Sequence, residues 1–72
     1  MRRLSFAKHI YGDTAVDEAV SVFERFGQLE RSDTPTAWVV DVSCRSPARE
    51  RQVAGELGNY TLGLAVKARG RK

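Results

Sequence analysis

Cysteine and histidine each occur only once in this chain of 72 residues, as Cys44 and His9. A single cysteine cannot form a disulfide within the chain, which is typical of proteins from a reducing compartment. One cysteine and one histidine also provide too few ligands for a zinc site, which usually takes about three or four protein ligands. We therefore predict neither a metal site nor a cofactor. Cys44 closes an apolar strand pattern, so we interpret it as a small buried hydrophobic residue.

Long apolar runs are also missing. No segment approaches the roughly 18 residues needed to cross a bilayer, and the sequence MRRLSFAKHIYGD has no continuous apolar stretch behind its arginines. We expect a cytoplasmic protein with no membrane partner. The composition, with 42% hydrophobic and 29% charged residues, indicates one folded domain over residues 1–72. A domain of this size buries only ~60% of its unfolded surface, so a homodimer or another protein partner would add stability.

The formal net charge of +3 is unevenly distributed along the chain. Half of the twelve basic residues lie near the two ends: Arg2, Arg3, Lys67, Arg69, Arg71 and Lys72. Residues 4–66 therefore hold six basic side chains against nine acidic ones, a net charge of −3. This acidic body disfavours nucleic acid as a partner. The alternative that stays open is a small nucleic-acid-binding or regulatory module that uses its basic termini.

The first element is predicted from alternation in RLSFAKHIY, residues 3–11. Leu4, Phe6 and Ile10 lie on one side of this strand, and Lys8 interrupts the apolar series. A lysine in that position is typical of an edge strand, where a charged side chain reaches solvent. An exposed edge is also a place where an extended peptide can add itself as a further strand.

A helix is predicted from about Ala15 to Phe26. Thr14 and Asp17 are spaced as a capping box, and Gly27 stands where a left-handed C-terminal cap would fall. Apolar residues recur at helical spacing, and they include two phenylalanines that we expect to be buried against a sheet: Val16, Ala19, Val20, Phe23 and Phe26.

Two strands and a turn are predicted next. QLERS, residues 28–32, is a short polar strand, and DTPT, residues 33–36, is a turn that contains Pro35. AWVVDVSC, residues 37–44, is the strongest strand in the chain. One face of this strand is expected to form the core: Trp38, Val40, Val42 and Cys44.

The last third of the chain has two interpretations. Ser46 and Pro47 are typical of an N-cap and a first helical residue. Four apolar residues at helical spacing would carry this helix to about Val66: Val53, Leu57, Tyr60 and Leu64. In the alternative the helix stops at Gly58 and a final strand follows, because each glycine inside a helix costs about 1 kcal/mol. Residues 68–72 are predicted to form a basic disordered tail.

The predicted fold class is α+β, a two-layer sandwich in which a small antiparallel sheet carries two helices on one face, in the order βαββα. A final strand would instead give a ferredoxin-like βαββαβ chain. The segment GELGNYTLG separates these alternatives. Gly55, Gly58 and Gly63 either break the helix or let it approach another backbone closely. We favour the helix.

The stretches FAKHIYGDTAVDEAVSVFERFG and GELGNYTLG, together with the strand between them, resemble the small HxsD-like proteins of His-Xaa-Ser peptide-maturation systems. In that family a first strand ends in a Tyr-containing turn, a helix with an aromatic end follows, and a later helix carries an Asn, Tyr and Leu signature. Tyr11, Phe23 and the segment from Asn59 to Leu62 occupy those places here. The match runs from about Leu4 to Leu64.

The resemblance implies a non-catalytic accessory protein of a ribosomally made peptide (RiPP) maturation system. Such a protein would be encoded beside radical SAM enzymes and would bind the maturation enzyme or its precursor peptide. The candidate partner-binding residues are Tyr11, Glu56, Asn59 and Tyr60. In the alternative interpretation, Tyr60 is a core residue with its hydroxyl at the rim, and Asn59 satisfies a nearby backbone group.

A catalytic site is not predicted. His9 and Tyr11 share one side of the first strand, and they could transfer a proton if Asp13 approached them. The sequence offers no activated nucleophile, second histidine or glycine-rich phosphate loop beside them. We therefore expect a protein that is not an enzyme, with His9 as a surface residue near a turn.

Overall fold

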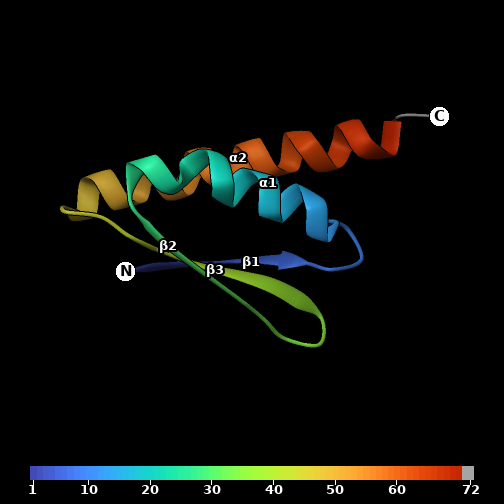
Figure 1. The fold of residues 1–72 in the computed structure, drawn as a ribbon, viewed down its shortest axis with the longest axis horizontal. Helices are drawn as coiled ribbons and strands as arrows, with labels where there is room; N and C mark the ends of the chain where they lie inside the picture. Colours follow the sequence, from blue (N-terminus) through green and yellow to red (C-terminus); the bar gives the residue numbers. More distant parts are fainter. Residues whose placement is uncertain (71–72) are drawn as a thin grey trace.

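A three-stranded antiparallel sheet lies against two helices in the computed structural model, which describes residues 1–70 and the side chains of residues 1–68 (Figure 1). The strands are β1 (Arg2–Ala7), β2 (Gln28–Asp33) and β3 (Ala37–Ser43). The helical elements are α1 (Asp13–Phe23), the short 3-10 turn η1 (Glu24–Phe26) and α2 (Pro47–Gly70). This is the predicted α+β fold, with both helices on one side of the sheet. The ferredoxin-like alternative is wrong, because residues 59–67 are helical.

Strand β3 occupies the centre of the sheet, in the order β1-β3-β2. Val40 and Val42 on this strand are completely buried, and Val40 lies opposite Leu4 of β1. Trp38 and Cys44 are partly buried and pack against the same core. The most apolar strand is central because a central position removes the most apolar surface from water. The predicted core face is therefore confirmed for Val40 and Val42, whereas Trp38 is only partly buried and Cys44 is partly buried just beyond the end of the strand.

The core fills the space between this face of the sheet and the helices. Phe6 is its main contribution from β1. The buried apolar residues that the two helices contribute to it are Val16, Ala19, Val20, Phe23, Val53, Ala54 and Leu57. Helix α2 packs on β1 and β3, and α1 packs on β3 and on α2. Each helix therefore has one buried face and one face that is open to solvent.

Strand β1 ends earlier than the sequence predicts. Ala7 is its last residue, and the N–H groups of Ile10 and Tyr11 both donate to the carbonyl oxygen of Ala7, at 3.0 and 2.9 Å. These bonds close a turn, so Ile10 is exposed and does not join the core face. The predicted edge position is confirmed, because β1 pairs only with β3 in the described sheet.

Helix α1 begins at Asp13 with Gly12 in the N-cap position, and no side chain within residues 1–68 caps it. The predicted capping box of Thr14 and Asp17 is therefore wrong. The carboxylate of Asp17 instead accepts a 2.9 Å hydrogen bond from the guanidinium of Arg31 on β2. A charged donor on the sheet competes well with a backbone N–H for a carboxylate.

The end of α1 also differs from the prediction. The helix ends at Phe23, and the next three residues tighten into η1. This turn leaves Phe26 40% exposed, so only one of the two phenylalanines is buried as expected. Gly27 has a φ of 175°, which is extended backbone, so the predicted left-handed cap is wrong.

Helix α2 begins as the sequence predicts. The hydroxyl oxygen of Ser46 accepts a 3.1 Å hydrogen bond from the backbone N–H of Arg49, and Pro47 is the first helical residue. The helix continues to Gly70, so it includes residues 68–70 of the predicted disordered tail. The rest of that tail, residues 71–72, lies outside the described residues. Over residues 1–70, no helix has the length and apolar character that crossing a membrane requires.

The glycines of GELGNYTLG do not break α2. A Cβ at Gly55, Gly58 or Gly63 would meet no described atom within 4 Å beyond the local helix backbone. The buried residues in this part of α2 are Val53, Ala54, Leu57, Thr61 and Ala65. The hydroxyl of Thr61 donates to the carbonyl oxygen of Leu57 at 2.7 Å. Tertiary packing of this face outweighs the low helix propensity of glycine.

The other face of the sheet carries an ion pair between neighbouring strands. The Nε and Nη2 atoms of Arg3 donate to the two carboxylate oxygens of Asp41, at 2.8 and 3.1 Å. The hydrogen bonds from Arg3 lower the pKa of Asp41 below its ordinary value of 3.8. The lowered pKa means that the unfolded chain binds more protons in acid than the folded chain does.

Replacement of Asp41 by asparagine is expected to make the free energy of unfolding less sensitive to acid than it is in the wild type. The contribution of the Arg3–Asp41 pair is complete above pH 3.8 and is lost as the pH falls through the lower folded pKa. Urea midpoints at pH 5 and below pH 3 measure this difference. Arg3→Gln should reduce the pH dependence in the same direction. A pH dependence as steep as that of the wild type in both variants would contradict the role of this pair.

Candidate partner-binding surfaces

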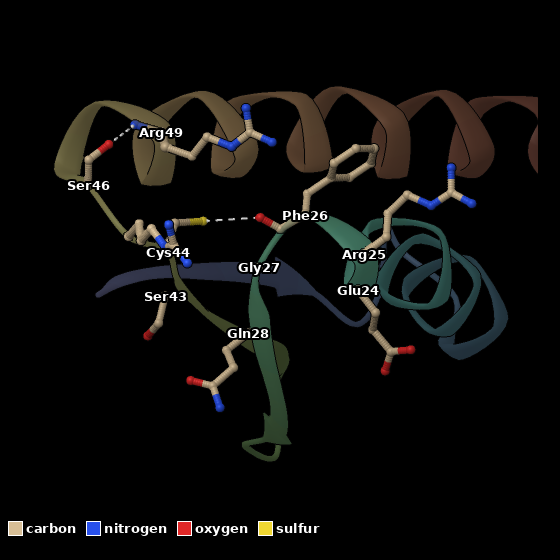
Figure 2. Close-up of a pocket in the computed structure, with 10 residues that line it drawn as sticks. Glu24, Arg25, Phe26, Gly27, Gln28, Ser43, Cys44, Ser46 and Arg49 are labelled. Carbon is tan, nitrogen blue, oxygen red and sulfur yellow. Dashed lines mark hydrogen bonds between the residues drawn. The ribbon is translucent and has the colours of Figure 1, made fainter.

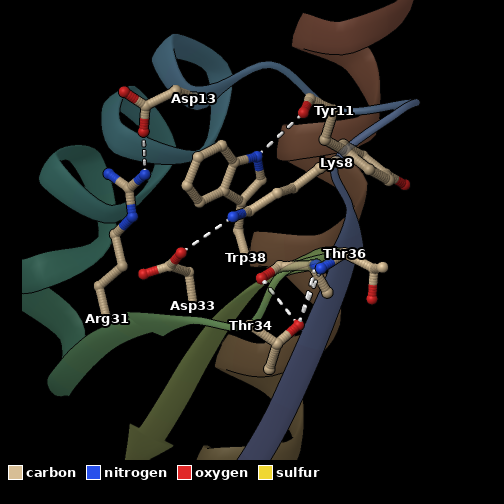
Figure 3. Close-up of polar contacts among 9 residues, drawn as sticks. Lys8, Tyr11, Asp13, Arg31, Asp33, Thr34, Thr36 and Trp38 are labelled. Atoms are coloured by element: carbon tan, nitrogen blue, oxygen red, sulfur yellow. Dashed lines mark hydrogen bonds and ion pairs between the residues drawn. The ribbon is translucent and has the colours of Figure 1, made fainter.

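Tyr11 belongs to a joined cluster of residues at the end of the sheet where β1 leads into α1 (Figure 3). Its ring packs edge-on against Phe6 with the centroids 5.0 Å apart, and its carbonyl oxygen accepts a 3.0 Å hydrogen bond from the indole N–H of Trp38. The indole ring also has two cations over it, Lys8 at 4.3 Å and Arg31 at 5.2 Å from the centroid. The cluster fixes the path of the chain between β1 and α1.

Both cations of this cluster have carboxylate partners. Lys8 binds Asp33 at 2.9 Å, and Arg31 binds both Asp13 and Asp17 of α1. The carboxylate of Asp13, which the sequence placed near His9 as a possible proton acceptor, thus has Arg31 as its hydrogen-bond partner. The charges of this cluster tie β2, α1 and the turn after β1 together.

Glu56, Asn59 and Tyr60 are exposed on α2 and lie within about one turn of each other. The ring of Tyr60 packs edge-on against Phe23 of α1, with the centroids 5.6 Å apart, and the residue is 36% exposed. Tyr60 therefore lies at the rim of the core, with its ring both packed and accessible. Tyr11 makes its ring contact on β1, so the described structure gives no contact between it and these three residues.

The outer edge of β1 is open over the part of the chain that the structure describes. The N–H of Lys8 donates to the carbonyl oxygen of Thr36 at 2.8 Å, which makes this position a hydrogen-bonded pair with the chain leading into β3. Backbone groups in antiparallel strands point alternately toward and away from the partner strand. The N–H and C=O groups of Arg3 and Ser5 therefore point outward, and no other described strand lies there.

A cavity of about 660 Å³ opens where η1 leads into β2 and β3 leads into α2 (Figure 2). Gly27 allows these two connections to lie close together. A Cβ at this position would stand 2.7 Å from the Sγ of Cys44 and 3.0 Å from the carbonyl oxygen of Ser43. The thiol of Cys44 also approaches the carbonyl oxygen of Phe26 at 3.6 Å. Only glycine leaves enough room for this approach.

Three exposed arginines line this cavity: Arg25 of η1, Arg45 of the connection after β3, and Arg49 in the first turn of α2. Within the described side chains, none of them has a carboxylate at ion-pair distance. In Figure 2 the exposed ring of Phe26 lies between the side chains of Arg25 and Arg49. The cavity, which we call the arginine pocket, therefore combines positive charge with an apolar ring.

Glu50 does not neutralise this pocket, because both of its oxygens are used in holding the start of α2. One oxygen lies 2.9 Å from the amino group of Met1, and the other accepts a 3.2 Å hydrogen bond from the N–H of Cys44. The amino group, followed by the N–H of Cys44, lowers the pKa of Glu50. The carboxylate of Glu50 lies in the first turn of α2, so it is also near the positive end of the dipole of this helix.

Motif reasoning misses the arginine pocket, because its arginines come from separate connections of the chain. The property of the sequence that points to this pocket is the distribution of its basic residues. Of the six basic residues within residues 4–66, Lys8 and Arg31 are ion-paired, which leaves four. Three of these four line the pocket, and the fourth is Arg51.

The fold and these surfaces define a small α+β domain with an open sheet edge and a positively charged pocket. Comparison of the chain with protein-family models, curated proteins and solved structures gives no significant match. The assignment of a function therefore depends on the surfaces described above and on the motif resemblance.

Proposed function

We propose that this chain is a non-catalytic accessory protein of a ribosomal-peptide maturation system, and that it binds a radical SAM enzyme or the precursor peptide of that enzyme. Two arguments support the proposal. The first is the motif resemblance to HxsD-like proteins, from about Leu4 to Leu64. The second is the open edge of β1, which is the observation that carries the proposed way of binding a peptide.

The open edge fits an extended peptide. The outward N–H and C=O groups of Arg3 and Ser5 would pair with the backbone of an added strand, as in other proteins that bind peptides by β-augmentation. Strand β1 contains no proline, which would interrupt such pairing. Its closest lysine, Lys8, is held by Asp33 instead of projecting freely from the edge. The precursor peptide would therefore extend the sheet by one strand.

A folded enzyme would use a different surface of the domain. Tyr60 offers an accessible ring whose position is already fixed by Phe23, so little side-chain entropy is lost on contact. Glu56 and Asn59 surround it with polar groups. Tyr11 is half-buried near the end of β1, where it would contact a peptide bound at the edge. The four candidate residues thus divide between the two possible partners.

Replacement of Ser5 by proline is expected to weaken binding of the precursor peptide by at least about tenfold. The substitution removes an outward N–H, and so it disrupts the hydrogen bonds between β1 and the added peptide strand before and after this position. The backbone hydrogen bonds between β1 and β3 are made by the residues on either side of Ser5, so the midpoint temperature of thermal unfolding should change little. Binding is measured by titration with the precursor peptide encoded beside this chain. Ser5→Ala is the matched control, because it alters the same side chain and retains the N–H.

Equal binding by Ser5→Pro and Ser5→Ala would rule out strand addition at β1. The broader proposal would be overturned if neither the neighbouring precursor peptide nor a neighbouring radical SAM enzyme bound the domain. A nucleic-acid role is tested by a salt-dependent titration with DNA or RNA, where tight and salt-sensitive binding would favour it. One of the basic residues near the N-terminus, Arg3, is already paired with Asp41, which weakens that alternative.

A further inference from the structure

Three arginines that have no carboxylate partner among the described side chains lie together at one end of this otherwise acidic domain. Residues 4–66 carry a net charge of −3, yet three of their four unpaired arginines line one pocket. Such a concentration of like charge is unfavourable in the free protein and becomes favourable when an anion binds. The arrangement therefore points to a negatively charged ligand.

We propose that the arginine pocket binds carboxylate side chains of an acidic segment in the partner polypeptide. The inference rests on the proposed function, because it names the class of sequence that the peptide or enzyme presents to this domain. Guanidinium groups match a carboxylate with two parallel hydrogen bonds, and Arg25, Arg45 and Arg49 supply three such groups from three separate segments of the chain. A volume of about 660 Å³ accommodates a few residues of a peptide.

The contacts around the arginines favour a peptide over other anions. The exposed ring of Phe26 adds an apolar surface for the methylene groups of a glutamate or for a neighbouring apolar side chain. Arg49 also lies in the first turn of α2, where the helix dipole favours an anion. The dipole adds to the pocket but does not define it, since Arg25 and Arg45 belong to other elements.

The charges beyond the pocket disfavour a nucleic acid. Glu24 lies at the pocket itself, and Glu30 follows on β2. A phosphate backbone carries charge at every nucleotide, so a strand leaving the pocket would run into these carboxylates. A short acidic peptide can instead end at the pocket, with its carboxylates beside the three arginines.

Titration of the full chain with a capped hexaglutamate peptide at low ionic strength tests the proposal directly. We expect saturable binding that capped hexaglutamine does not show. Arg49→Gln and Arg25→Gln should each raise the Kd by about tenfold, because each removes a charge-assisted contact. Arg51→Gln is the matched control. It makes the same change of charge two residues along the same helix, outside the pocket lining, and should alter the Kd by less than about twofold.

Three results would overturn the proposal: no difference between hexaglutamate and hexaglutamine, equal weakening by Arg51→Gln and Arg49→Gln, or tighter and arginine-dependent binding of oligothymidylate or inorganic phosphate. Because Arg25 and Arg49 are exposed and lie on different elements, their variants are expected to fold, and thermal unfolding verifies this. The probe contains neither the enzyme nor the precursor peptide. A failure with hexaglutamate therefore removes the pocket assignment alone, whereas a failure with the neighbouring proteins removes the proposed function.

Discussion

Replacement of Leu57 by alanine is expected to lower the free energy of unfolding by about 2–5 kcal/mol. Leu57 is completely buried at the centre of the core, between the sheet and the two helices. The truncation removes apolar contacts and leaves a cavity that the surrounding strands and helices fill only in part. A domain of this length has a total stability of roughly 4–11 kcal/mol, so this single change would unfold a large fraction of the molecules.

Chemical denaturation followed by circular dichroism measures this loss. Leu62→Ala is the matched control on the same helix, because Leu62 is 44% exposed and its truncation should change stability by no more than about 0.5 kcal/mol. Similar losses in the two variants would mean that α2 does not present Leu57 to the sheet.

Replacement of Gly27 by alanine is expected to destabilise the domain by about 1–3 kcal/mol. The new methyl group would lie 2.7 Å from the sulfur of Cys44 and 3.0 Å from the backbone oxygen of Ser43. The sulfur belongs to a side chain and can move, whereas the backbone oxygen belongs to the sheet. The loss is steric, because the extended backbone of Gly27 is open to any residue.

Gly58→Ala provides the contrast to this substitution. A methyl group at Gly58 meets no atom of the described structure outside the local helix, and alanine has the higher helix propensity, so stability should rise by up to about 1 kcal/mol. Thermal or urea unfolding of both variants measures the difference in sign. A Gly27→Ala protein as stable as the wild type would show that the two connections at the arginine pocket are not held close together. Weaker partner binding by Gly58→Ala, despite greater stability, would indicate that this part of α2 contacts the partner.

The elements that the sequence predicts well are those with strong local signals. Strand β3 is a run of apolar and β-branched residues, and the start of α2 is marked by Ser46 and Pro47. The errors occur where a distant group decides the structure. Arg31 on β2 takes the carboxylate of Asp17 that a capping box would use. The helix favoured through the glycines of GELGNYTLG is correct, although glycine propensity alone left the strand alternative open.

The candidate sites show the same division between local and distant information. The exposed positions of Glu56 and Asn59 follow from helical spacing, and the edge position of β1 follows from Lys8. Helical spacing instead places Tyr60 on the apolar stripe of α2, and the structure leaves it at the rim of the core. The arginine pocket could not be predicted in this way. Its residues converge only because the approach of Gly27 to Cys44 brings two connections of the chain together.

The strand order also affects the sequence in which the strands pair during folding. A three-residue loop, residues 34–36, joins β2 to β3, whereas the 29 residues from 8 to 36 separate β1 from β3. Closing the longer loop costs about 2 kcal/mol more in chain entropy. We therefore expect the β2–β3 hairpin to form before β1 joins the sheet. On this expectation, β1, whose outer edge would receive a peptide, is the last strand to join the sheet. A bound peptide would then be added to the sheet in the same direction, next to β1 and on the side away from the hairpin.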